Sequence, residues 1–185
     1  MQRQLQLALL DEVRDPEPPI RLSALFYEPG AAEQVAEELR TLGDVVVGVS
    51  REVEGLTEAL DLPVFSQDAN GPVPDGAYQG FPLFETDADR VFYALQGRRL
   101  PAKRHPYGMQ LRIEELAGDR ITDEGGDLWH RRIEEIDAVA CALCAHRYAV
   151  AHAYWLDGVV LPGTSLPDTF SSKGVMPPVE RISLP

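Results

Sequence analysis

Residues 44–50, with the sequence DVVVGVS, restrict the fold of this chain more than any other segment. Their apolar side chains do not alternate with polar ones, a pattern that predicts a strand covered on both faces. In the preceding segment, residues 31–42, Val35, Leu39 and Leu42 recur at helical spacing, and Gly43 marks the expected end of that helix. A helix that leads into a buried strand is typical of a parallel crossover. The sequence therefore predicts an α/β fold with helices packed over a sheet.

The same patterns predict further elements on both sides of this segment. The expected strands cover residues 4–13, 20–27, 81–86 and 159–161. The expected helices cover residues 87–97, 108–118 and about 128–151. We expect the segment DRITDEGGD to be a loop. Residues 163–185 are rich in proline and serine, which indicates a tail that lies over the surface or a neighbouring subunit, or that is disordered.

Length and composition restrict the class of protein. With 185 residues the chain can form one sizeable core, and we expect one domain over residues 1–162 followed by the tail. The apolar run 138–145 is too short to cross a membrane, and the start of the chain does not resemble a signal peptide. Cys141 and Cys144 lie in a helical pattern, where buried, inert thiols are expected rather than half of a zinc site. Two such cysteines favour a cytoplasmic protein.

Charge is distributed unevenly along the chain. The formal net charge of −13 disfavours a general nucleic-acid coat protein, because it repels phosphates at long range. Residues 90–113, however, contain no Asp or Glu. Their basic residues are Arg90, Arg98, Arg99, Lys103, Arg104 and Arg112, with Tyr107 among them. This segment could bind an anion, or it could be a solvated loop whose cations pair with surrounding acids.

Asp137 stands out in the last expected helix. Helical steps of three and four residues place it on the same face as Ala140, Cys141, Cys144 and Tyr148, so its carboxylate is directed at protein rather than open water. A buried carboxylate needs a positive or hydrogen-bonding partner, and a divalent cation is one such partner. Alternatively, Asp137 complements the dipole at the helix N-terminus.

Two segments resemble a known family. The sequence EEIDAVACALCAHRYAVAHAYWLDGVVLP resembles the closing segment of domain-of-unknown-function family 429, predicted nucleases with a ribonuclease-H-like fold, in its Asp137-Ala138 pair and its Gly158 to Pro162 ending. Upstream, FETDADRVFYALQGRRLPAKRHPYGMQLRIEELAG is similar to a family stretch with a glutamate after a short strand, then a helix, a lysine and a Gly-x-x-x-Arg helix. Glu85, Lys103, Gly108 and Arg112 occupy those positions. The likeness spans residues 44–162.

This resemblance implies a mixed five-stranded sheet, with its first strands antiparallel, flanked by helices. It also implies a nuclease in which acidic side chains hold Mg²⁺ or Mn²⁺ ions that activate water and stabilise the leaving oxygen. Asp137 and Glu85 would be metal ligands, while Lys103 or Arg112, with Arg99 in the same segment, would contact the phosphate of a nucleic acid.

The chain also differs from this pattern. It has no Gly-Ile-Asp-like first strand, and Ser50 stands where the family has an Asp. Glu52 or Glu54 could supply the missing catalytic carboxylate, or both could be ordinary surface acids. These differences favour a second hypothesis, a catalytically inactive ribonuclease-H-like domain that binds a partner or forms a homo-oligomer. A small-molecule enzyme on the same fold is a third hypothesis.

Overall fold

The computed structural model describes residues 3–9, 21–26, 31–42, 45–50, 56–119, 121–123 and 128–163. The strands are β1 (Arg3–Leu9), β2 (Arg21–Phe26), β3 (Val47–Ser50), β4 (Gly71–Pro72), β5 (Leu83–Thr86), β6 (Ile121–Asp123), β7 (Ala153–Leu156) and β8 (Val159–Pro162). The helices are α1 (Ala32–Thr41), α2 (Leu56–Leu60), α3 (Ala77–Gly80), α4 (Ala88–Gln96), α5 (Pro106–Gly118) and α6 (Ile133–Ala149). Of the expected tail, only Gly163 belongs to the described residues.

The strands pair in both parallel and antiparallel fashion, so the structure is mixed α/β as predicted. Hydrogen bonds divide the described strands into three sheets, with orders β2-β1-β6, β3-β5 and β4-β7-β8, rather than joining five strands in one. The first and third sheets are antiparallel, and β3 and β5 are parallel. Within the described residues, no helix has the length and apolar character needed to cross a membrane.

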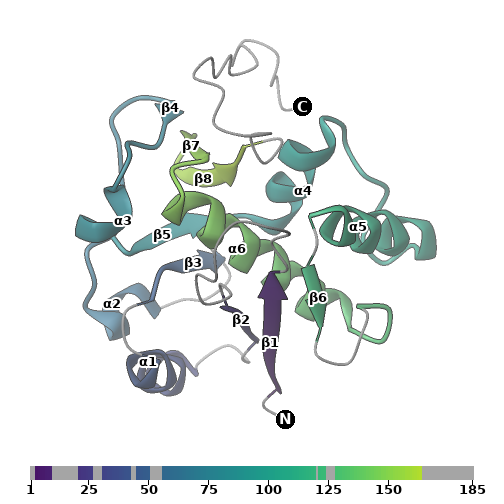
Figure 1. Ribbon diagram of the computed structural model, residues 1–185, viewed down its shortest axis with the longest axis horizontal. Helices are drawn as coiled ribbons and strands as arrows, with labels where there is room; N and C mark the ends of the chain where they lie inside the picture. Colours follow the sequence, from purple (N-terminus) through teal and green to yellow (C-terminus); the bar gives the residue numbers. More distant parts are fainter. Residues whose placement is uncertain are drawn as a thin grey trace, which may run out of the picture.

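Helix α6 lies across the middle of the molecule (Figure 1). It packs against β2, β3 and β8 and against α4 and α5. Val139, Ala140 and Leu143 of this helix are fully buried in the main hydrophobic core, and Ala138 and Ala142 are partly buried against it. The approach to β3 is close, because a Cβ atom on Gly48 would lie 2.9 Å from the backbone oxygen of Cys141. The run of small residues therefore lets this helix sit directly on the strands.

The β3-β5 pair is covered on both faces, as the unalternating run 44–50 predicted. On one face, the Phe84 ring lies 4.6 Å from that of Tyr148 in α6, and Thr86 Oγ1 lies 3.6 Å from Cys144 Sγ. On the other face, Leu83 and Val49 belong to a second hydrophobic cluster with residues of α1 and α2. In Figure 1, α1 and α2 lie on the side of these strands away from α4 and α5.

Three predictions of local structure were wrong or incomplete. The expected loop DRITDEGGD contains β6, whose Ile121 is buried and pairs with Leu9 of β1. The last helix begins at Ile133 rather than near residue 128, because Arg132 is its N-cap with extended backbone. The expected strand near residue 160 has a partner, β7, which was not predicted. The two are joined by Asp157 and Gly158, both with positive φ, in a tight hairpin.

Candidate functional site

The charged residues around Asp137 form a polar cluster where α4, α5 and α6 meet. The side chain of Asp137 is 19% exposed, and its Oδ2 accepts a hydrogen bond of 2.8 Å from Nζ of Lys103. Its other oxygen, Oδ1, is buried and has no hydrogen-bond partner in the part of the chain that the structure describes. Burial raises the pKa of Asp137, and the negative charge of Asp89 raises it further. Lys103 and, more weakly, Arg112 act in the opposite direction. Asp137 thus lies among charges from α4, α5 and the loop between these two helices.

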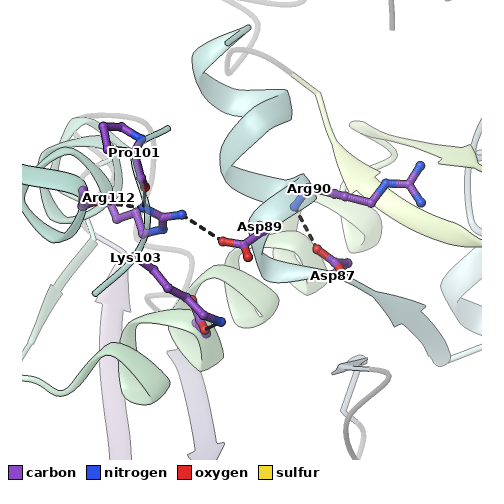
Figure 2. Close-up of polar contacts among 8 residues, drawn as sticks. Asp87, Asp89, Arg90, Pro101, Lys103 and Arg112 are labelled. Carbon is purple, nitrogen blue, oxygen red and sulfur yellow. Dashed lines mark hydrogen bonds and ion pairs between the residues drawn. The ribbon is translucent and has the colours of Figure 1, made fainter. Parts of the chain in front are cut away.

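Arg112 of α5 is the second cation of this cluster, and it is 4% exposed. Its Nη1 donates hydrogen bonds of 3.0 Å to the backbone oxygens of Pro101 and Gly108. Its Nη2 donates to Asp89 Oδ1 at 2.8 Å, and its guanidinium carbon lies 5.3 Å from the centre of the Phe92 ring. Figure 2 shows this side chain directed at Asp89, with Lys103 below it. The guanidinium is therefore committed to contacts within the fold.

The loop between α4 and α5, residues 97–105, is held at several points. Gly97 ends α4 with φ 66°, and its N–H donates to the Tyr93 oxygen. Arg112 holds the oxygen of Pro101, and the salt bridge to Asp137 holds Lys103. At the far end, the Nδ1 atom of His105 accepts a hydrogen bond from the Tyr107 N–H and caps α5. We call this segment the anchored loop, because its backbone is fixed from both sides.

The cations of residues 90–113 divide into two groups. Lys103 and Arg112 pair with acids, and Arg90 bonds the Leu156 oxygen and lies 3.5 Å from Asp157. In Figure 2, Arg90 points away from the Asp89-Arg112 pair. Within the described parts of the chain, the second group, Arg98, Arg99 and Arg104, makes no ion pair or hydrogen bond, and all three are exposed. Pairing with surrounding acids, one of the two hypotheses for this segment, thus holds for Lys103 and Arg112, whereas anion binding by the second group stays a prediction.

The structure does not bring Glu85 to Asp137. Glu85 lies on β5 between Phe84 and Thr86, whose side chains both contact α6. Because side chains alternate along a strand, the side chain of Glu85 projects from the opposite face, on the side of Leu83, α1 and α2. Asp137, by contrast, belongs to α6 itself. Glu52, the third expected catalytic acid, lies outside the described residues, as does Glu54.

The polar cluster does not fit a divalent metal ion as it stands. No group of three or more His, Cys, Asp or Glu side chains able to hold a metal occurs among the described residues. The charges that act on Asp137 are the cations Lys103 and Arg112 and one carboxylate, Asp89. An ammonium group 2.8 Å from Oδ2 repels a second cation from that oxygen. Hard cations need several oxygen ligands, and here the nearest partner of the carboxylate is a nitrogen.

Two further residues bear on the predictions. Asp89, the partner of Arg112, was not singled out in the sequence, where residues 87–97 were expected only to form a helix. Asp87 does cap α4, accepting a hydrogen bond of 2.9 Å from the Arg90 N–H. Cys141 and Cys144 are buried and form no disulfide, as predicted, and burial raises the pKa of Cys144 to about 12.

No protein-family model matches the chain, and comparisons with curated proteins and with solved structures found no match. The class of the protein is thus defined by its own fold and cluster: a mixed α/β protein with a polar cluster and an arginine-bearing anchored loop.

Proposed function

We propose that this chain is a ribonuclease-H-like α/β domain that binds single-stranded nucleic acid and does not cut it by a metal-dependent mechanism. We also propose that its strands correspond to those of a five-stranded ribonuclease-H-like sheet. One observation carries it: in a chain of net charge −13, Arg98, Arg99 and Arg104 are exposed and have no carboxylate partner among the described residues. Arginines that have no intramolecular partner are available to an anion from outside.

The anchored loop supports this proposal because the backbone that carries these arginines is held in place. A segment already ordered before binding loses less conformational entropy when it contacts its ligand. Guanidinium groups can contact phosphate through two parallel hydrogen bonds. Tyr107, which follows the loop, is 51% exposed, so its ring is accessible for stacking with an unpaired base.

The acidity of the remaining surface weakens binding but does not prevent it. The Debye length is about 8 Å at physiological ionic strength, so exposed acids farther from the loop are largely screened. We therefore expect modest affinity and a clear dependence on salt. If three phosphates are contacted, the slope of log K against log salt concentration should be about −2 for a single strand.

The absence of cutting is proposed from the state of the acids. Asp137 already forms a salt bridge with Lys103. The side chain of Glu85 projects from the face of β5 that is turned away from α6. A two-metal mechanism requires at least two carboxylates that converge on the same ions. A partner-binding role makes no such demand, and it is consistent with Arg112 serving the fold rather than a substrate.

The test is fluorescence anisotropy with a labelled oligothymidylate, compared with a duplex of the same length. We expect Arg99→Gln to bind about tenfold more weakly, since one charge-assisted hydrogen bond is lost. Arg40→Gln is the matched control, because Arg40 lies on α1 and bonds the Ala59 oxygen instead. Equal loss in both variants would mean that only overall charge matters, and would contradict a site on the anchored loop.

The same samples test for cutting. Incubation with Mn²⁺ should leave the oligonucleotide intact. Mn²⁺-dependent cleavage that is lost in Asp137→Asn would contradict the proposal and would support a metal-dependent nuclease instead.

A further inference from the structure

The polar cluster contains two salt bridges, one between Lys103 and Asp137 and one between Arg112 and Asp89. We propose that Lys103 is the built-in counter-cation of Asp137 and keeps divalent metal ions out of this cluster. This inference goes beyond the proposed function, since it concerns the occupancy of the carboxylate and not nucleic acid.

The first observation is the placement of Lys103. Its ammonium is 2.8 Å from Oδ2 of a carboxylate that is only 19% exposed. The Lys103 side chain itself is 36% exposed, so the pair lies at the edge of the core rather than fully in solvent. Its backbone follows Pro101, whose oxygen is held by Arg112, and Ala102, whose oxygen accepts from the His105 N–H at 2.9 Å. The fold thus holds the backbone next to Lys103 in a position from which its ammonium reaches Asp137.

The second observation is that one segment neutralises both acids. Residues 101–112 supply Lys103 to Asp137 of α6 and Arg112 to Asp89 of α4. The two carboxylates are close enough to act on each other, since the charge of Asp89 disfavours ionisation of Asp137. Without these cations, the two acids, which come from two helices, would lack their counter-charges and attract a positive ion. Lys103 of the loop and Arg112 of α5 supply this positive charge instead.

The third observation is the buried Oδ1 of Asp137, which has no hydrogen-bond partner among the residues that the structure describes. A bound divalent ion would draw on this oxygen as a ligand, but the ammonium at Oδ2 opposes its entry. Removal of that ammonium alone should leave both oxygens of this carboxylate, which is 19% exposed, without a partner among the described residues, and Asp89 nearby. Such a variant should gain an affinity for Mn²⁺ that the natural chain lacks.

The experiment measures thermal unfolding of the full chain in MnCl₂ and in KCl of equal ionic strength. The variants are Lys103→Met, which keeps the length of the side chain, and Arg104→Met, an exposed neighbour that forms no ion pair with the described residues. We expect no Mn²⁺-specific shift of the midpoint in the natural chain or in Arg104→Met. Lys103→Met should unfold at a lower temperature, and Mn²⁺ should raise its midpoint by several degrees. The double variant Lys103→Met/Asp137→Asn should lose the response to Mn²⁺.

Two results would overturn the inference. One is stabilisation of the natural chain by Mn²⁺ that disappears in Asp137→Asn, because the carboxylate would then bind metal with Lys103 in place. The other is a Lys103→Met variant that is no less stable than Arg104→Met and does not respond to Mn²⁺.

If Lys103→Met does not fold, Mn²⁺-induced broadening of amide resonances in the natural chain gives the answer. Selective broadening at Asp137 and Asp89 would overturn the inference, and its absence would support it. The inference shares its view of Asp137 with the proposed absence of cutting, but neither measurement involves nucleic acid, so failure here is distinguishable from failure of nucleic-acid binding by the anchored loop.

Discussion

Gly108 of α5 lies so close to Ala102 that a Cβ atom added to it would be 2.3 Å from the Ala102 backbone oxygen. The same atom would be 2.8 Å from the Pro101 oxygen. Both neighbours are backbone atoms of the anchored loop and cannot rotate away. We therefore expect Gly108→Ala to lower the free energy of unfolding by about 2–3 kcal/mol, since overpacking forces the loop off α5. Urea denaturation followed by circular dichroism measures this change.

Gly118→Ala is the control for that substitution, because Gly118 ends the same helix and a Cβ there would meet no described atom within 4 Å. This variant should be neutral or more stable by up to about 1 kcal/mol, as alanine favours helix more than glycine. A Gly108→Ala variant as stable as Gly118→Ala would show that the loop does not need this close approach.

The guanidinium of Arg112 should not be replaceable by an amine. Arg112→Lys removes the fork that bonds the Pro101 and Gly108 oxygens and Asp89 together. With a side chain this buried, we expect a loss of about 2–4 kcal/mol in the free energy of unfolding. Arg104→Lys changes the same chemistry on an exposed side chain and should have little effect. Similar stability of the two variants would contradict a structural role for Arg112.

Stability should depend on the titration of Asp137. Its pKa is raised in the folded protein above the ordinary value of 3.8, mainly by burial. Between these two pKa values the folded chain binds more protons than the unfolded chain, so stability falls as pH rises through that window. The contribution of Asp137 therefore favours the fold most at pH below 3.8.

Asp137→Asn removes this titration. Relative to the natural chain, the variant should become more stable as pH rises from about 4 to about 7. Denaturant titrations at several pH values give the comparison, and Asp68→Asn, an exposed acid, controls for the loss of one charge. A difference between the natural chain and Asp137→Asn that does not change with pH would be inconsistent with burial of this carboxylate.

The two cysteines should be unreactive while the chain is folded. Both are buried, and a pKa of about 12 leaves the thiol of Cys144 almost entirely protonated at neutral pH. We expect Ellman's reagent to label them only in denaturant. Ala117→Cys, on an exposed position of α5, should add one rapidly labelled thiol. Rapid labelling of the natural chain under native conditions would contradict the packing of α6 on the strands.

Elements with a strong local signal could be predicted from the sequence. The helical spacing of residues 31–42 gave α1, and the pair Asp87 and Gly97 marked both ends of α4. The short strand β6 could not be predicted in this way. Three residues are too few to show a period, and Ile121–Asp123 is a strand only because β1 offers it a partner.

Pairing across the molecule was likewise beyond local patterns. Sequence spacing indicated that Asp137 faces protein and needs a partner, which is the case. It did not indicate that the partner is Lys103, 34 positions away, or that the side chain of Glu85 projects from the face of β5 turned away from α6. Which face of a strand a distant helix covers is decided by packing of the whole core.

The sequence by itself determined the mixed α/β class, the buried strand before residue 50 and the concentration of arginines in an acidic chain. Only the tertiary structure decided which of those cations are neutralised. The reason is that charge pairing depends on distances between side chains remote in the chain, and these distances are set when α5 and its loop pack against α4 and α6.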